Sequence, residues 1–277
     1  MAKRSKKVIY YSDELNDDFA GTNIKQKPLG KDYRYMNDNI FVRVGTWIVY
    51  YLIAIPLVFL LQKLVVRQKL VNRKLIKQCK KQGCFIYANH TMAMGDAFTG
   101  PLVCAPKKCY VIANPDAVSI KGLRTIVKML GAIPLASSFD ESKKMLQCVK
   151  KRIGQGSAVM IYPEAHIWPY YTDIRPFAAT SFKYPVNLDA PVFCITNCYQ
   201  KSLLLKRPKV VSIVDGPFYP DTSLPKAERA EKLRDQVHET MCQRAKESST
   251  YAYVKYVKRP VELIGDFETC EPVKIAE

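Results

Sequence analysis

Histidine is scarce in this sequence, and the cysteines lack the spacing that metal sites and disulfide frameworks need. The 277 residues include three histidines and nine cysteines, and no two cysteines form a Cys-x-x-Cys pair. Several cysteines instead lie in apolar runs, such as Cys194 in the segment 192–195. This usage is typical of reduced, buried thiols in a cytosolic compartment, and it argues against a zinc site or a disulfide-stabilised fold.

The glycine motifs of several large enzyme classes are also missing. The segment Gly154-Gln155-Gly156-Ser157 has the wrong order for a Gly-x-Ser-x-Gly nucleophile elbow. Neither a Walker A loop nor a Gly-x-Gly-x-x-Gly dinucleotide motif occurs. The sequence therefore gives poor support to a serine hydrolase, a P-loop nucleotidase or a dinucleotide-dependent enzyme.

Acidic residues are too few to balance the basic ones. The chain has 43 Lys and Arg against 25 Asp and Glu, a net charge of +18. Such a surface attracts polyanions. Aromatic residues do not interleave with the basic run after residue 62 in the manner of a platform for single-stranded nucleic acid. We therefore expect anionic lipid headgroups as partners, and no nucleic acid.

One long uncharged run is present, at residues 44–62. Its nineteen residues approach the length of about 20 that a membrane-spanning helix needs. Trp47, Tyr50 and Tyr51 lie at its start like an interfacial aromatic belt, and a dense basic stretch follows it. We predict a membrane-associated helix at 41–66, spanning or half-inserted, with the active domain on the cytoplasmic side. The alternative is a buried core helix followed by a solvated basic helix.

The N-terminal segment 1–40 is polar and has no signal-peptide pattern. From residue 83, short apolar strands alternate with helices. The predicted strands are 84–87, 109–113, 132–135, 158–162, 191–195 and 210–214, and the predicted helices are 123–130, 141–153 and 225–246. This alternation predicts an α/β domain over 67–277, with a mostly parallel central sheet flanked by helices.

His90 and Asp96 are the first candidate site, because they follow a predicted strand directly. Acyl transfer to a hydroxyl needs a base, and neutral imidazole suits that role near pH 7. A carboxylate can hold the ring in the correct tautomer and stabilise the imidazolium. Ligand sites in open α/β sheets lie beyond the carboxyl ends of the strands. The alternative is a structural histidine in a loop at a strand end.

Glu164 and His166 form the second candidate site, again straight after a buried strand. The Glu164 carboxylate would either bind an acceptor hydroxyl or support a neighbouring backbone. Arg175, Lys183 and Lys121 are candidate partners for a substrate phosphate. The alternative for each of these cations is a solvated basic surface.

Taken in order, four blocks resemble the 1-acyl-glycerol-3-phosphate acyltransferase (lysophospholipid acyltransferase) family. They lie at 89–96, 131–135, 162–166 and 190–195, and the resemblance covers about 80–220. The stretch from Pro163-Glu164 to 174–177 looks most like a bacterial branch of the family.

The resemblance implies a function and a set of roles. His90 would be the general base, Asp96 would orient it, and Glu164 would belong to the acceptor site. The enzyme would move a fatty acyl group from a thioester of coenzyme A or acyl carrier protein to the hydroxyl of a lysophospholipid, in phospholipid biosynthesis. It would need no metal, bound cofactor or covalent acyl-enzyme.

The chain departs from the family pattern in three places. Five residues separate His90 from Asp96, where the family has four, and we expect Gly95 to absorb the extra residue as a local bulge, because glycine tolerates unusual backbone angles. The family arginines of the second and third blocks are missing, so Arg175 or His166 would have to replace them. These departures keep three alternatives open: a different amphiphilic acceptor, a catalytically inactive lipid-binding relative, and, from charge alone, a nucleic-acid-binding protein.

Overall fold

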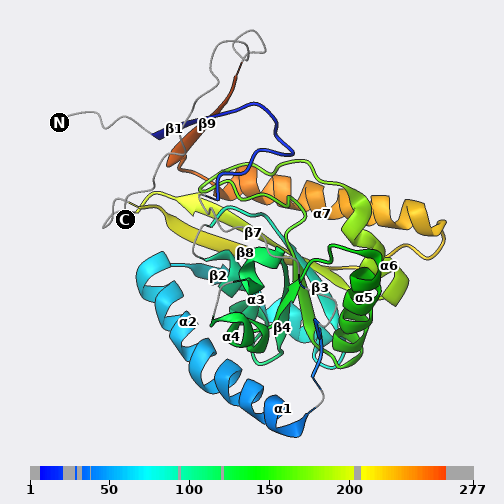
Figure 1. Cartoon of the computed structure of the whole chain (residues 1–277). Coiled ribbons are helices and arrows are strands. Elements are labelled where there is room, and N and C mark those ends of the chain that lie inside the picture. Colours follow the sequence, from blue (N-terminus) through cyan, green and yellow to red (C-terminus); the bar gives the residue numbers. More distant parts are fainter. Residues whose placement is uncertain are drawn as a thin grey trace.

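A mostly parallel sheet forms the centre of the molecule, as predicted (Figure 1). The computed structural model describes residues 7–20, 29, 33–37, 39–92, 95–119, 122–202 and 207–259. Within these residues the main sheet has seven strands in the order β2-β8-β7-β3-β6-β4-β5. All neighbouring strands are parallel except β7 and β8, which are antiparallel. The strands are β2 (Lys69–Val71), β3 (Cys84–Ala88), β4 (Cys109–Ala113), β5 (Ala132–Pro134), β6 (Ala158–Ile161), β7 (Val192–Gln200) and β8 (Lys209–Phe218).

Helices cover both faces of this sheet, which explains why its central strands are apolar without alternation. Along β3, Phe85 and Tyr87 pack against the side of α5 and α7, while Cys84 and Ile86 pack on the opposite face. The first face is covered by α5 (Phe139–Gly154), α6 (Lys183–Leu188) and α7 (Lys226–Ser248). The second is covered by α3 (Asp96–Cys104) and a 3-10 helix, η3 (Arg73–Cys79). The short α4 (Arg124–Met129) lies beside β5.

An apolar helix runs along the domain before β2, as the sequence predicts. It is continuous over Ile40–Val66 and combines α1 (Ile40–Trp47), α2 (Ile55–Leu61) and two π-helical stretches. Its mean hydropathy of 2.2 and its length would allow it to cross a membrane. One side packs on the domain through Tyr50, Val58 and Gln62. The rest exposes large apolar side chains, among them Phe41, Leu52, Leu57, Leu60 and Leu64.

Two chain segments far apart in sequence form a second, two-stranded sheet. Strand β1 (Lys7–Tyr11) pairs in parallel with β9 (Val254–Lys258). Trp168 anchors this sheet because its ring stacks on Tyr256 and its indole N–H donates to the Asp17 carbonyl at 2.7 Å. The described residues 7–20 therefore contact the α/β domain through β9 and Trp168. The division into a segment 1–40 and a domain 67–277 stays a prediction.

Candidate active site

The predicted site residues gather at the carboxyl ends of β3 and β6, which are parallel neighbours. Asn89 and His90 follow β3 directly, and Tyr162 and Glu164 follow β6. Asp96 opens α3, which covers the adjacent sheet face. Topology therefore brings together residues that lie up to 74 positions apart in sequence.

His90 and Asp96 form a hydrogen-bonded pair. His90 Nδ1 lies 2.6 Å from Asp96 Oδ2, and the side chains are 25% and 4% exposed. The carboxylate also accepts the backbone N–H of Met92 at 3.0 Å and lies in the first turn of α3, where the helix dipole favours a negative charge. An ionised carboxylate only accepts hydrogen bonds, so with Asp96 ionised the Nδ1 atom is the donor of this contact and a neutral ring has its lone pair on Nε2. The pair is arranged as a base and its orienting group.

The five-residue spacing does not disrupt the pair. The backbone N–H groups of Gly95 and Asp96 both point back to the Met92 carbonyl, at 3.2 and 3.3 Å, so the chain reverses before α3. Gly95 has φ −112° and ψ −25°, a conformation open to any residue. The expectation that Gly95 forms a bulge with unusual backbone angles is therefore wrong. Residues 93 and 94, within the same loop, lie outside the described part of the chain.

A row of buried polar side chains supports Asp96 from behind. Asn197 Nδ2 lies 3.4 Å from Asp96 Oδ1, and Ser212 donates to Asn197 Oδ1 at 2.6 Å. Gln68 Nε2 then donates to Ser212 Oγ at 2.7 Å. Asn89 Oδ1 accepts the backbone N–H of Asn197 at 2.8 Å, and this contact holds the backbone of Asn197 in place. We expect these contacts to limit the rotation of the Asp96 carboxylate.

Burial raises the pKa of Asp96, and the hydrogen bond from His90 acts against this rise. Asp96 is the carboxylate that must be ionised to orient His90. Its ionisation therefore depends on the donors around it, namely His90 and the backbone N–H of Met92.

Glu164 supports the backbone at the base of the site. Its carboxylate accepts the N–H of His90 at 3.1 Å and the N–H of Arg175 at 3.2 Å. The Arg175 guanidinium lies 3.4 Å from Glu164 Oε2, and neither side chain is more than 1% exposed. Burial raises the pKa of Glu164, and Arg175 opposes this. Of the two roles considered for Glu164, the contacts favour the support of a neighbouring backbone.

Arg175 is not placed to receive a substrate phosphate. Besides Glu164, its guanidinium donates to the carbonyls of His166 and Glu14 and lies over the Trp168 ring. A phosphate would have to displace these partners inside the core. The expectation that Arg175 replaces the missing family arginine is therefore contradicted by its burial.

His166 and the other predicted cations lie apart from the pair. His166 is 36% exposed on its side chain and faces Asp18 at 3.7 Å. Within the described residues no hydrogen bond links it to His90 or Asp96, so its role at the acceptor site stays a prediction. Lys183 is exposed on α6. Lys121 lies outside the described residues.

Two residues of the site were not predicted from the sequence. The Tyr162 ring stacks on the His90 ring with centroids 4.4 Å apart, and its hydroxyl donates to the Asp96 carbonyl at 2.5 Å. Asn197 is the second residue. The feature of the sequence that could have identified it is a polar amide side chain within the otherwise mostly apolar strand β7. Buried polar side chains need partners, and those partners often lie in a functional site.

Among the described residues no hydrogen bond is made by His90 Nε2, and a histidine held by a carboxylate in this way is an arrangement used by the class of enzymes that activate a hydroxyl group by base catalysis. Comparison with protein families supports this class, because residues 65–197 match the family model named Acyltransferase. The matched segment contains His90, Asp96 and Glu164.

One solved structure that the chain matches is the 1-acyl-sn-glycerophosphate (LPA) acyltransferase PlsC from Thermotoga maritima. The two chains share 14% sequence identity, the match covers 76% of this chain and 95% of that chain, and the TM-score is 0.49. Comparison with curated proteins gave no match.

Proposed function

We propose that this chain is a membrane-associated O-acyltransferase that moves a fatty acyl group from a thioester to the hydroxyl of a lysophospholipid, such as 1-acyl-glycerol-3-phosphate. The thioester carrier is coenzyme A or acyl carrier protein. The observation that carries the proposal is the 2.6 Å contact of His90 with Asp96, with the imidazole still 25% exposed. An inactive lipid-binding relative would have no need for this arrangement.

The reaction follows from the pair. The acceptor hydroxyl donates a hydrogen bond to His90 Nε2, which takes the proton as the oxygen attacks the thioester carbonyl carbon. Asp96 stabilises the imidazolium while the tetrahedral intermediate exists. When the carbon–sulfur bond breaks, the sulfur leaves as a thiolate and takes the proton back from Nε2. The products are an ester and a free thiol, and His90 returns to its neutral form.

The apolar helix supports placing this reaction at a membrane surface. Near its middle, the Tyr50 hydroxyl receives the N–H of Cys109, at the start of β4. Near its end, Gln62 donates to the carbonyl of Gly95 at 2.9 Å, next to Asp96. The charged domain packs along this helix, so a helix crossing the bilayer would carry charged groups into hydrocarbon. We therefore propose that the helix lies within one leaflet, with the domain on the cytoplasmic side.

Arg67 is the cation we propose for the acceptor phosphate. It follows the apolar helix directly and its guanidinium lies 3.4 Å from Ser202 Oγ. Its neighbour Val66 packs against Met92 in the loop between His90 and Asp96. Arg67→Ala should raise the KM for a phosphate-bearing acceptor about tenfold or more and change kcat little. An unchanged KM would exclude Arg67 from the acceptor site.

The first test is transfer of labelled acyl groups from both thioester carriers to a panel of lyso-lipids. His90→Ala should abolish transfer, and His238→Ala, which changes a histidine on α7, is the matched control. Thermal unfolding of each variant checks that the fold is intact. Label transfer by folded His90→Ala protein at the parent rate would contradict the mechanism. No transfer by the folded parent would favour a different acceptor or the inactive lipid-binding alternative.

A further inference from the structure

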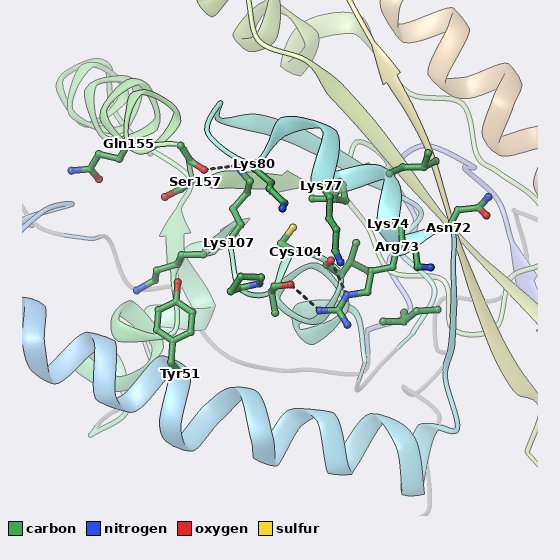
Figure 2. Close-up of a pocket in the computed structure, with 18 residues that line it drawn as sticks. Tyr51, Asn72, Arg73, Lys74, Lys77, Lys80, Cys104, Lys107, Gln155 and Ser157 are labelled. Atoms are coloured by element: carbon green, nitrogen blue, oxygen red, sulfur yellow. Dashed lines mark hydrogen bonds between the residues drawn. The ribbon is translucent and has the colours of Figure 1, made fainter.

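Figure 2 shows a basic groove. It lies at the edge of the sheet opposite to the edge that carries His90. Its lining includes the residues just before β4 and β6, namely Lys107, Lys108 and 155–157. His90 lies after the carboxyl end of β3, which runs parallel to β6. β3 has five residues, so the two regions are separated by about 16 Å. The groove is therefore distinct from the acyl-transfer site.

The groove is positively charged and large. Its volume is about 1150 Å³, and no Asp or Glu is among the eighteen described residues that line it. The charged lining residues are Arg73, Lys74, Lys77, Lys80, Lys107 and Lys108.

Three of these cations are fixed by backbone carbonyls. Arg73 donates to Val103 and Ala105, Lys107 to Gln82 and Gly156, and Lys108 to Met129. Their carbonyl partners carry no full charge, so these contacts leave the positive charge uncompensated.

The other three cations form a row. Lys74, Lys77 and Lys80 are exposed and spaced by three residues along η3 and its C-cap. A 3-10 helix has three residues per turn, so side chains at this spacing lie above one another. Figure 2 shows Lys77 and Lys80 extending from this helix toward the groove. Three ammonium groups on one side of a helix repel one another unless an anion lies between them.

Lys108 is the most buried cation of the groove whose pKa is shifted, and Arg152, which acts on it, lines the adjoining groove. The pKa of Lys108 falls to about 8, first because of burial and second because of the charge of Arg152. An anion in the groove would oppose this shift.

The apolar helix borders the groove. Tyr51 of that helix lines it and projects toward it in Figure 2. A second groove continues along the helix, contains Trp47, Arg43 and Arg152, and shares Tyr51 and Lys108 with the first. Basic and aromatic side chains beside an exposed apolar helix are the features that contact lipid headgroups at a membrane surface.

We propose that this groove binds the phosphate of an anionic membrane lipid, as a second lipid site separate from the acyl-transfer site. The inference rests on the membrane association proposed above, but not on the acyl-transfer reaction. The lipid is a ligand of the groove and is not acylated there, because the described lining residues include no histidine and no carboxylate that could form a base pair like His90 and Asp96. Its headgroup would hold the domain against an anionic membrane.

The test uses full-length protein in nonionic detergent micelles, so that the apolar helix is covered and headgroup binding is measured alone. Titration calorimetry compares short-chain phosphatidylglycerol, phosphatidylcholine and inorganic phosphate. We expect binding of phosphatidylglycerol only. The triple variant Lys74→Gln, Lys77→Gln, Lys80→Gln should weaken this binding at least about tenfold.

A second triple variant controls for net charge. Lys183→Gln, Lys226→Gln, Lys246→Gln removes the same charge from α6 and α7, and should bind like the parent. Equal weakening by both triple variants would show diffuse attraction and overturn the proposal. Binding of inorganic phosphate as tight as that of the lipid would assign the groove to a soluble anion and also overturn it.

Two further arms separate this inference from its alternatives. His90→Ala protein should keep full phosphatidylglycerol binding. A failure of the acyl-transfer assay can therefore be told apart from a failure of the lipid-binding assay. Duplex RNA is the last probe. If the first triple variant loses RNA binding but keeps lipid binding, the groove is a nucleic-acid site and the lipid proposal is wrong.

Discussion

In the proposed mechanism, the hydrogen bond between His90 Nδ1 and the Asp96 carboxylate determines which nitrogen of the imidazole ring carries the hydrogen. Asp96→Asn removes the charge and allows the amide to present a donor to Nδ1. We expect kcat to fall about 10²- to 10⁴-fold, with a smaller change in KM, because the wrong tautomer is populated. Steady-state kinetics beside His90→Ala would measure this. Activity equal to the parent would show that another group orients His90.

Ser212 allows the support behind Asp96 to be tested without touching the pair. Ser212→Ala leaves the buried Asn197 Oδ1 without the Ser212 donor, while Gln68 Nε2 keeps its contact with Thr99 Oγ1 at 2.8 Å. Leaving buried polar groups unpaired costs about 1–3 kcal/mol of unfolding free energy. We also expect a several-fold lower kcat at unchanged KM, measured with urea unfolding on the same samples, and restoration of kcat in Ser212→Thr. A stability loss with unchanged kcat would reduce Ser212 to a structural role.

Lys108 gives a pH-dependent prediction. Its folded pKa of about 8 is below its ordinary value of 10.5, so between these values the unfolded chain holds a proton that the folded chain has lost. The free energy of unfolding therefore rises with pH across this window, by up to about 1.4 kcal/mol per unit from this group. Lys108→Met should lack this rise. Urea unfolding of parent and variant at pH 7.5 and 9.5 tests this, and parallel pH slopes would contradict it.

At the scale of the element, the apolar helix is bound on one side and exposed on the other. Leu52→Ser, Leu57→Ser and Leu60→Ser together change exposed positions of its outer face. Loss of this apolar area should move the protein to the soluble fraction without changing its thermal unfolding. The control replaces exposed leucines of the domain, Leu15, Leu123 and Leu146, with serine. A triple variant that stays in the membrane fraction would show that other surfaces hold the protein there.

Elements with a strong local pattern were predictable from the sequence. The strands 109–113 and 158–162 and the helix 141–153 agree closely with β4, β6 and α5. The N-cap of α5 is Ser138, whose side-chain oxygen accepts the backbone N–H of Glu141.

What depends on distant partners was not predictable. β1 and β9 lie near opposite ends of the sequence, so their pairing leaves no local pattern. α3 contains a buried proline and is buried along most of its length, so its sequence shows no clear helical periodicity. In the site, His90 and Asp96 could be named because they lie in one block. The role of Arg175 could not, because its burial is set by Trp168 and by the segment that contains Glu14.

At the scale of the whole molecule, Trp168 joins the two terminal segments to the active site. Its ring is fully buried among Tyr11, Phe19 and Tyr256, while its backbone N–H donates to the His90 carbonyl at 3.0 Å. Trp168→Ala should lower the free energy of unfolding by about 3–5 kcal/mol. Trp47→Ala, which changes the other tryptophan at an exposed position, is the matched control for thermal unfolding. Equal effects of the two variants would show that Trp168 is not an anchor.

The contact of Gln62 with Gly95 places the end of the apolar helix beside Asp96 of the proposed catalytic pair. Under the proposed function, a lyso-lipid reaches His90 by lateral diffusion and the two-chain product leaves the same way, without passing through water. The relevant substrate concentration is then the mole fraction of acceptor in the leaflet and not its amount per volume of solution. Diluting the acceptor with inert lipid at constant bulk concentration would slow the enzyme, which makes membrane composition itself a regulator of the rate.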